Sequence, residues 1–382
     1  NLGINFNELE LQDSVLLIGS HIHKELPLAG LKLRKMVLNG GKVSVVNSVD
    51  YKFNFAISAK AITAPTDFVA TLAGIAKELL ELSPKASVTG ADQLLAKIVP
   101  NADAKKIAAQ LLVGKKRHII IGPLALMHPQ ASMLNSLATL IAKIINATVG
   151  QFSDGANAAG AWLTGCVPHR LLGGAPVKAP GKNARQMLEE PLKCYILYAI
   201  EPEFDSILGE QALQTLRESA FVVVFSAYQS ETLLQIADVI LPLAPFAETS
   251  GTLININGTW QTQAEILSPY ADSRPGWKIL RVMGGLAGFH NFEQESTTEI
   301  LAEISEKIKT YELQPKTKWT CPDDLNLVKN KGLVHLAPVA LYSTDSIVRR
   351  AAALQLTRDA AAEPNLQLNR KMANSLNLAL GD

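Results

Sequence analysis

The sequence has little cysteine, which argues against metal centres built on thiolates. Its 382 residues include three cysteines, Cys166, Cys194 and Cys321, which lie far apart and form no Cys-x-x-Cys pair. Iron–sulfur clusters need several closely grouped thiolates, and structural zinc needs four ligands, usually at paired spacings. We therefore expect neither in this chain, and an odd number of thiols is typical of a reducing compartment.

The chain also lacks a long apolar run and an excess of charge. Its most apolar stretches, 119–121 and 137–145, fall short of the roughly 18 to 20 residues that a transmembrane helix needs. Lys and Arg number 36 against 35 Asp and Glu, a net charge of +1 that favours neither nucleic acid nor an anionic membrane surface. The sequence starts at Asn1 without a signal-peptide pattern, so we expect a portion of a longer protein.

Motifs for nucleotide binding and nucleophilic catalysis are absent as well. No Gly-x-Ser-x-Gly elbow occurs. The turn after the first predicted strand, residues 19–23, has one glycine rather than Gly-x-Gly-x-x-Gly. The second strand ends at Asn47, where a nicotinamide site has an acidic residue. These features argue against classical NAD binding. His21 and His23 have no third ligand nearby in sequence, so they are interpreted as loop histidines rather than metal ligands.

What the chain does contain is a regular alternation of short apolar runs and amphipathic stretches. This alternation predicts right-handed crossovers and a parallel sheet covered on both faces. The predicted strands are residues 15–18, 43–46, 118–121, 195–200, 221–225 and 239–241. The predicted helices are residues 27–39, 67–82 (N-capped by Thr66), 103–113, 134–145, 205–219 (N-capped by Asp205) and 231–236.

We therefore predict the α/β class, with a doubly wound and mostly parallel sheet in one domain over residues 1–290. A glycine- and alanine-rich section, 150–185, interrupts the alternation and is expected to be mostly loop. Residues 291–382 are predicted to form an appendage. It consists of a helix at 297–309, then extended chain from about residue 312 and a weakly structured tail after Pro364.

Two groups of acidic residues have both a functional and a structural interpretation. Glu201, Glu203 and Asp205 follow a predicted strand, and the carboxyl end of a strand is a functional location in open α/β sheets. Pro202 equally indicates a turn there, with Asp205 as a helix N-cap. Glu248 lies in a loop, where it is either a general base or a loop anchor.

The segment 237–261 carries a resemblance to a known family. It reads as a buried strand stopped by Pro242, an acidic loop, and a glycine turn into a second strand. This order resembles the late signature of the molybdopterin oxidoreductase superfamily. Its amino-acid sequence is similar to that of the large iron–sulfur subunit (the G subunit) of bacterial NADH–quinone oxidoreductase, respiratory complex I. Further segments that resemble this subunit, in the same order, are 156–174, 201–205, 268–281 and 342–357.

Departures from the catalytic members of that superfamily concern the cofactor cleft. This chain has Thr259 where catalytic members usually have Arg, and residues 19–22 depart from their Gly-x-Asn-Pro loop. Asn47 stands where many of them have an acidic residue. Each change removes a group that would hold a large anionic ligand. The resemblance therefore implies a vestigial cleft, with no catalytic residue and no metal, whose candidate residues are Gly19, Ser20, Asn47 and Asn157.

The resemblance implies a non-catalytic scaffold within a complex that transfers electrons from NADH to quinone and translocates protons. No cofactor is expected in this segment, because the 2Fe-2S and 4Fe-4S clusters of such subunits belong to cysteine-rich domains that precede it. Expected partners are the NADH-oxidising flavoprotein module and the quinone-side peripheral arm. The expected location is peripheral, on the cytoplasmic side of the bacterial inner membrane.

Two alternatives remain open at this point. The first is part of a true molybdopterin-dependent oxidoreductase, related to formate dehydrogenase or nitrate reductase. The second is a nicotinamide-binding dehydrogenase of unrelated lineage.

Overall fold

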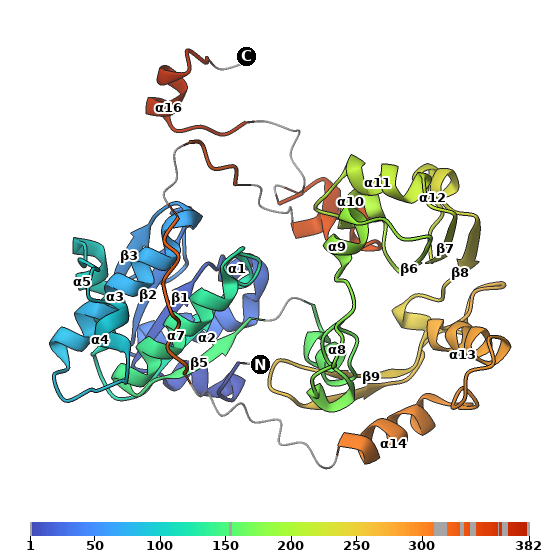
Figure 1. Cartoon of the computed structure of the whole chain (residues 1–382), viewed down its shortest axis with the longest axis horizontal. Coiled ribbons are helices and arrows are strands. Elements are labelled where there is room, and N and C mark those ends of the chain that lie inside the picture. Colours follow the sequence, from blue (N-terminus) through green and yellow to red (C-terminus); the bar gives the residue numbers. More distant parts are fainter. Residues whose placement is uncertain are drawn as a thin grey trace. The chain divides into compact units, whose positions relative to one another are not determined.

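The computed structural model describes residues 2–152, 155–308, 319–328, 332–336, 341–357, 359–360 and 366–379 (Figure 1). The chain divides into two compact units. Unit 1 comprises Asn1–Gln186 and Ala244–His335, and unit 2 comprises Met187–Leu243 and Leu336–Asp382. Both units contain parallel sheets, which confirms the predicted α/β class. The parallel strands form two sheets rather than one, and a third sheet is a two-stranded antiparallel pair. Each unit contains residues from both sides of residue 290.

Unit 1 is built on a five-stranded parallel sheet of order β3-β2-β1-β4-β5. Its strands are β1 (Ser14–Ile18), β2 (Lys42–Asn47), β3 (Ala59–Ile62), β4 (Arg117–Ile121) and β5 (Thr148–Gln151). The apolar runs correctly predicted β1, β2 and β4. Strands β3 and β5 were missed because each has four residues and neither contains a continuous apolar run.

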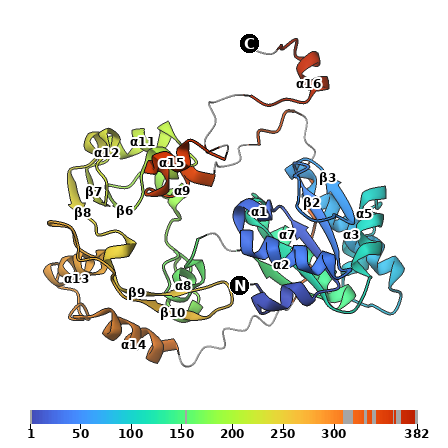
Figure 2. The same ribbon diagram turned by 180° about the vertical axis from the view of Figure 1, so that it is seen from behind.

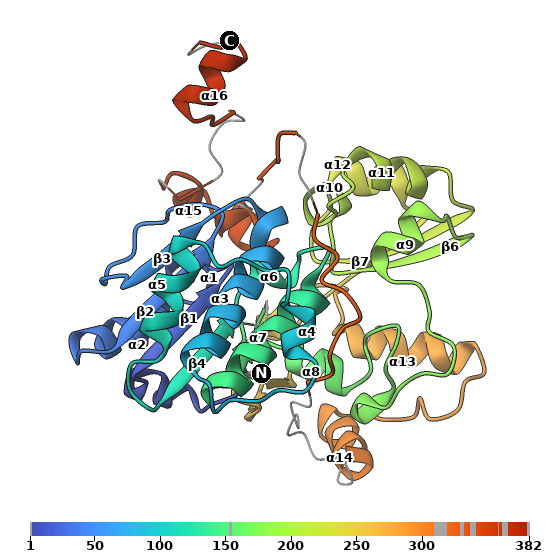
Figure 3. The same cartoon turned by 60° about the vertical axis from the view of Figure 1, so that its left-hand side comes forward.

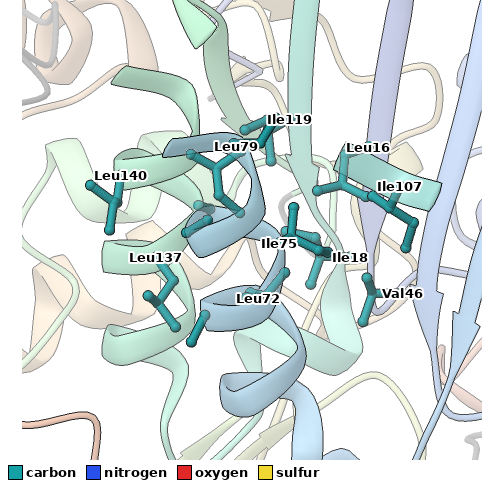
Figure 4. Close-up of a cluster of buried hydrophobic side chains, with 14 of the residues drawn as sticks. Leu16, Ile18, Val46, Leu72, Ile75, Leu79, Ile107, Ile119, Leu137 and Leu140 are labelled. Carbon is teal, nitrogen blue, oxygen red and sulfur yellow. The ribbon is translucent and has the colours of Figure 1, made fainter. Parts of the chain in front are cut away.

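Helices cover both faces of this sheet. On one face α3 (Phe68–Leu82), α5 (Ala102–Leu111) and α7 (Ala131–Ile145) lie side by side (Figure 3). Figure 4 shows their apolar side chains meeting those of the strands, with Ile75 near Ile18. On the opposite face α2 (Pro27–Leu38) and η1 (Phe6–Leu11) pack through Leu33, Met36 and Leu9. Each fully buried Leu or Ile contributes roughly 1.5–3 kcal/mol, so these two layers fix the sheet that carries the candidate site.

The first segment of unit 1 also contains shorter elements. They are α1 (Ile22–Glu25), η2 (Pro65–Asp67), α4 (Ala91–Leu94), α6 (Pro123–Leu126), α8 (Ala158–Leu163) and η3 (Leu172–Gly174). The predicted N-cap at Thr66 was wrong: Thr66 lies inside η2, and Asp67 precedes α3 without a side-chain cap. Pro65 pre-sets the backbone for this extra turn. The section 150–185 is mostly loop as predicted, although it contains α8.

The second segment of unit 1 contains an antiparallel hairpin and two helices. Its elements are η4 (Phe246–Glu248), β9 (Gly251–Ile254), β10 (Trp260–Gln263), α13 (Gly276–Leu286) and α14 (Thr297–Ile308). The helix predicted at 297–309 is confirmed through Ile308. Residues 309–318 lie outside the described residues, and so does part of the predicted extended chain.

Unit 2 has a three-stranded parallel sheet of order β6-β7-β8. Its strands are β6 (Cys194–Tyr198), β7 (Phe221–Ser226) and β8 (Val239–Pro242), and its helices before residue 243 are α9 (Ala184–Glu189), α10 (Pro202–Asp205), α11 (Glu210–Arg217) and α12 (Glu231–Ile236). Leu213, Leu216 and Leu233 of α11 and α12 pack with the buried side chains of β6 and β7. The helix predicted at 205–219 is interrupted, because Gly209 (φ +50°) separates α10 from α11.

The described residues in the carboxyl-terminal part of unit 2 include short helical turns (Figure 2). They are η5 (Leu341–Ser343), η6 (Val348–Arg350), α15 (Ala352–Gln355) and α16 (Arg370–Ser375). The prediction of extended chain from about residue 312 is therefore incomplete, because the described residues include these short helical turns. Pro364, after which a weakly structured tail was predicted, lies outside the described residues.

Candidate functional site

The candidate site of unit 1 lies at the carboxyl ends of β1 and β4. Strand β1 pairs with β2 on one side and with β4 on the other. The chain therefore builds one half of the sheet outward from β1 and then crosses to the other side of β1 to build the second half. In open α/β sheets this switch in strand order is where ligands bind, because the two loops that follow the strands diverge and leave a crevice. Gly19 follows β1 and Gly122 follows β4, so these two turns define what room is left.

The two turns close on one another. The Gly122 N–H donates to Ile18 O at 2.8 Å, and the Leu124 N–H donates to Gly19 O at 3.1 Å. Gly19 has φ +61°, and a Cβ added to it would lie 2.7 Å from Ala125 N. A Cβ added to Gly122 would lie 2.5 Å from Gly19 O. The backbones of the β1 and β4 turns are therefore in close contact, and neither glycine position has room for a side chain.

Asn47, at the end of β2, is committed to the first turn. Its side chain is fully buried, as is that of Ser20. The Ser20 N–H donates to Asn47 Oδ1 at 2.9 Å, and Asn47 Nδ2 donates to Ser20 O at 3.0 Å. Each such bond stabilises the fold by roughly 1 kcal/mol, and leaving a buried partner unpaired costs more. Asn47 thus locks the β1 turn instead of holding a ribose or a guanine base.

Glu25 of α1 takes up the remaining donors of this turn. Ser20 Oγ donates to Glu25 Oε2 at 2.5 Å, and the His21 N–H donates to Glu25 Oε1 at 2.9 Å. Donors in a loop after a first strand are the groups that usually bind phosphate or another anion. Here a carboxylate of the chain itself binds them. A large anionic ligand would lose these donors and meet a negative charge.

An aromatic loop covers the same turn. The ring of Tyr51 stacks on His21 with centroids 4.1 Å apart and an interplanar angle of 8°. Burial, and then the nearby carboxylate of Glu25, raise the pKa of the Tyr51 phenol. The residues between β2 and β3 are therefore tied to the β1 turn.

His23 holds the tip of that aromatic loop. Its ring lies 5.6 Å from Phe53 and 5.5 Å from Phe55, and its Nε2 accepts a hydrogen bond from the Asn54 N–H at 2.9 Å. Burial lowers the pKa of His23, which favours the neutral ring that this bond requires. Among the residues that the structure describes, no group of three His, Cys, Asp or Glu side chains is arranged to hold a metal ion.

The structure brings three of the four predicted cleft residues together, namely Gly19, Ser20 and Asn47. Asn157 has a different role. Its Oδ1 accepts a hydrogen bond from the Ile254 N–H at 2.8 Å, so it fixes the start of α8 to strand β9. A Cβ on Gly160 would lie 2.1 Å from that same oxygen, which explains why a glycine follows in the helix.

The glycine turn of the 237–261 segment is a structural anchor. Asn255 Oδ1 accepts from the N–H groups of Asn257 and Thr259 at 2.9 and 3.0 Å. Asn257 Oδ1 in turn accepts from the Phe6 N–H at 2.9 Å. The hairpin β9–β10 therefore holds the amino-terminal turn η1 of the same unit. Thr259 closes the hairpin through its backbone, without a charged side chain to offer a ligand.

Glu248 is positioned as a loop anchor. Its Oε2 accepts from the Tyr270 N–H at 3.1 Å and lies 3.4 Å from Ser273 Oγ. The carboxylate thus fixes the turn that follows β10. Of the two interpretations offered by the sequence, this geometry favours the structural one.

In unit 2 two of the three carboxylates after β6, those of Glu201 and Asp205, bind two arginines from far along the chain. Arg349 Nη1 donates to Glu201 Oε2 at 2.8 Å, and its Nη2 donates to Asp205 Oδ1 at 2.6 Å. Arg350 Nη1 donates to the same Glu201 Oε2 at 3.0 Å, and its Nη2 donates to Glu201 Oε1. The predicted N-cap role of Asp205 is wrong, because its other oxygen accepts from the Glu201 N–H at 2.8 Å.

Sequence reasoning singled out both partners of this cluster but did not pair them. The segments 201–205 and 342–357 lie more than 130 residues apart, and no local pattern connects them. Adjacent arginines in a segment with few other charges were the only available signal. Glu25 was missed for a different reason: a carboxylate in a short helix looks like ordinary solvated surface.

Taken residue by residue, the unit 1 crevice does not fit a large anionic pterin. Its backbone donors are bonded to Asn47 and Glu25, and its central space is filled by the Gly19 and Gly122 turns. Among the described helices none is long and apolar enough to span a membrane.

Comparisons with known proteins agree with the architecture. A sequence model for molybdopterin oxidoreductases matches residues 2–285. Two proteins of Staphylococcus aureus (strains USA300 and NCTC 8325 / PS 47), provisionally named formate dehydrogenases, are 33% identical over 75 residues, which are 20% of this chain and 8% of theirs. The match therefore covers a small part of those relatives. Acetylene hydratase from Pelobacter acetylenicus has a TM-score of 0.57 at 15% identity, over 80% of this chain and 54% of that one. At this identity the likeness concerns the fold alone.

Proposed function

This chain belongs to the molybdopterin oxidoreductase family, and we propose that it is a non-catalytic scaffold within it. Specifically, it forms the molybdopterin-oxidoreductase-like portion of the G subunit of a bacterial NADH–quinone oxidoreductase. The parent complex transfers electrons from NADH to quinone and couples this transfer to proton translocation. One observation carries the proposal: the crevice where the family fold would bind a ligand is filled and satisfied by the chain itself.

The energetics of that crevice favour the closed state. A pterin nucleotide would have to displace the two Asn47–Ser20 bonds and the two bonds to Glu25. Hydrogen bonds to charged groups are worth about 1.5–3 kcal/mol and neutral ones about 1 kcal/mol. Their combined loss is on the order of 5–8 kcal/mol, before any backbone rearrangement. A ligand would need that much additional binding energy, which the residues present do not offer it.

A scaffold function uses the remaining features of the fold. The parallel sheet of unit 1 is covered on both faces, and that of unit 2 packs against α11 and α12. Closely packed bodies of this kind are rigid, and a rigid body can hold cluster-bearing domains against an NADH-oxidising flavoprotein and a quinone-side arm. The 2Fe-2S and 4Fe-4S clusters would then reside elsewhere in the subunit. The chain would lie on the cytoplasmic side of the inner membrane as a peripheral part of the complex.

Metal analysis of the native complex tests this proposal. The complex that contains this chain would be purified and its molybdenum, iron and pterin measured per chain, with a molybdenum enzyme as a positive control. We expect iron without molybdenum or pterin, and co-purification with an NADH-oxidising flavoprotein. About one molybdenum per chain, or the absence of the flavoprotein, would contradict the scaffold proposal.

A true molybdopterin-dependent oxidoreductase is the second candidate. The similarity to the provisionally named formate dehydrogenases supports it, although over 75 residues. In that case the purified protein would contain molybdenum and reduce an artificial electron acceptor with formate or a related substrate. The replacement Glu25→Gln distinguishes the two candidates further, because it removes a negative charge that would repel an anionic cofactor. The cofactor content of the protein would rise if the crevice can open, as the second candidate requires, and would not change if the crevice stays closed.

A further inference from the structure

The carboxyl end of the unit 2 sheet is covered by residues 341–357, here called the C-terminal strap. This edge, like that of unit 1, is where open α/β sheets bind their ligands. The strap lies against α10, the first element after β6 (Figures 1 and 2). No residue of the strap is buried as a whole, so its attachment depends on a few side chains rather than on an apolar core.

Those side chains are Arg349 and Arg350. Each guanidinium makes two charge-assisted hydrogen bonds, and the Arg349 side chain is 8% exposed while that of Glu201 is 2% exposed. Glu201 raises the pKa of Arg350 above its usual value by accepting its hydrogen bonds. The planar guanidinium group of arginine holds its N–H donors in a fixed fork, so it can bind two carboxylate oxygens at once. The ammonium group of lysine cannot reproduce this geometry.

Aromatic rings complete the recognition of both guanidinium groups. The Arg349 Cζ lies 4.7 Å from the centroid of Phe204, and the Arg350 Cζ lies 4.2 Å from the centroid of Tyr228. Planar guanidinium groups stack on aromatic faces more readily than lysine does. Both arginines therefore share Glu201, Arg349 binds Asp205 as well, and each guanidinium has its own ring.

The acidic half of this contact is organised by unit 2 itself. Asp205 Oδ2 accepts from the Glu201 N–H, and Glu203 Oε1 accepts from Ser230 Oγ at 3.0 Å. Ser226 Oγ donates to the backbone oxygen of Tyr228 at 2.6 Å and so fixes the backbone of the residue whose ring Arg350 covers. None of these bonds involves the strap. These bonds therefore orient the acidic residues from within the sheet and its loops, independently of groups of the strap.

We propose that this edge of unit 2 is a binding site for a peptide segment with two adjacent arginines. The strap fills it within the chain, and the same segment supplied separately would compete for it. The site selects arginine over lysine, and while the strap is seated the edge is closed to small-molecule ligands. This inference does not depend on the scaffold proposal, because it concerns unit 2 contacts and not molybdenum content.

Binding of a synthetic strap peptide tests the proposal. The protein would be the full chain with Arg349→Ala and Arg350→Ala, which leaves the site free, and the probe would be a fluorescent peptide of residues 341–357. We expect saturable binding by fluorescence anisotropy that weakens as salt rises. Replacing both arginines of the peptide by lysine should weaken binding at least about tenfold, since even one lost charge-assisted bond has that effect.

Two further measurements keep the outcome decisive. Adding Glu201→Gln to the protein should abolish peptide binding, whereas the exposed control Glu210→Gln should leave it unchanged. If Glu201→Gln fails to fold, the lysine peptide with the folded arginine-deficient protein still decides the question. The proposal is overturned if the peptide does not bind, or if the arginine and lysine peptides bind equally well.

Discussion

Protonation of His118 should control the acid stability of unit 1. His118 lies in the interior strand β4, its side chain is fully buried, and its Nδ1 is 2.7 Å from Thr148 Oγ1. Burial lowers its pKa from 6.5 to about 4, against the opposing effect of hydrogen bonds. The folded chain therefore holds this ring neutral at pH values where the unfolded chain would protonate it.

The sign and size of the effect follow from this difference. Between pH 6.5 and about 4 the unfolded state binds more protons at this site than the folded state, so the free energy of unfolding falls as pH falls. The contribution is fully present above pH 6.5 and is lost by about pH 4. One pKa unit corresponds to about 1.4 kcal/mol. The loss due to His118 is therefore on the order of 3 kcal/mol across this range.

A comparison of variants measures this contribution. Urea denaturation monitored by hydrogen exchange in β4 would be recorded from pH 7.5 to 4 for the wild type, His118→Gln and the exposed control His290→Gln. The His118 variant should be less stable at pH 7.5 but should lose about 3 kcal/mol less than the wild type on acidification. Carboxylates such as Asp13, whose pKa is lowered by backbone hydrogen bonds, titrate in all three proteins. Equal pH dependence in wild type and His118→Gln would refute the reasoning.

Three other substitutions test the closed crevice and the strap. Gly19→Ala combines a positive φ with a Cβ 2.7 Å from Ala125 N, whereas the control Gly40→Ala has the positive φ alone. Gly19→Ala should therefore lower the free energy of unfolding by at least about 1 kcal/mol more than Gly40→Ala. Equal losses in the two variants would contradict the packing argument. Asn47→Asp removes the donor to Ser20 O and should cost about 2 kcal/mol by urea denaturation; unchanged stability would show that the turn is not held there. Glu201→Gln should speed tryptic cleavage after Arg350, since breaking a buried ion pair costs about 3–5 kcal/mol, and unaltered protection would show that the strap is held by other contacts.

The sequence contained most of the fold but little of what fills the site. Strands β1, β2 and β4 were predictable because a strand buried on both faces needs a continuous apolar run. The short strand β3 has no such run and takes its place by pairing with β2. The interruption at Gly209 was also not predicted: an isolated glycine is tolerated within a helix, and here its φ of +50° separates α10 from α11.

Asn47 illustrates why loss of a ligand-binding residue and gain of a structural one can look alike in sequence. From the sequence, Asn47 predicted only that this chain lacks the acidic residue that many catalytic family members have at this position. In the folded chain the amide is suited to this position because it both accepts from and donates to the Ser20 backbone. An aspartate in the same rotamer would accept but could not donate. The same substitution that weakens a cofactor site therefore strengthens the closed turn.

The resemblance centred on residues 237–261 acquires a physical meaning from these contacts. Its turn binds Phe6 through Asn257, and its Glu248 fixes the chain after β10. These contacts stabilise unit 1 whether or not a cofactor is bound, so a chain that lost the cofactor would still be selected to retain them. A family signature made of fold-stabilising contacts can therefore outlast the chemistry of the family. The β1 turn, which lies where open α/β sheets bind ligands, differs in this respect, because its Ser20 hydroxyl and His21 N–H donate to Glu25.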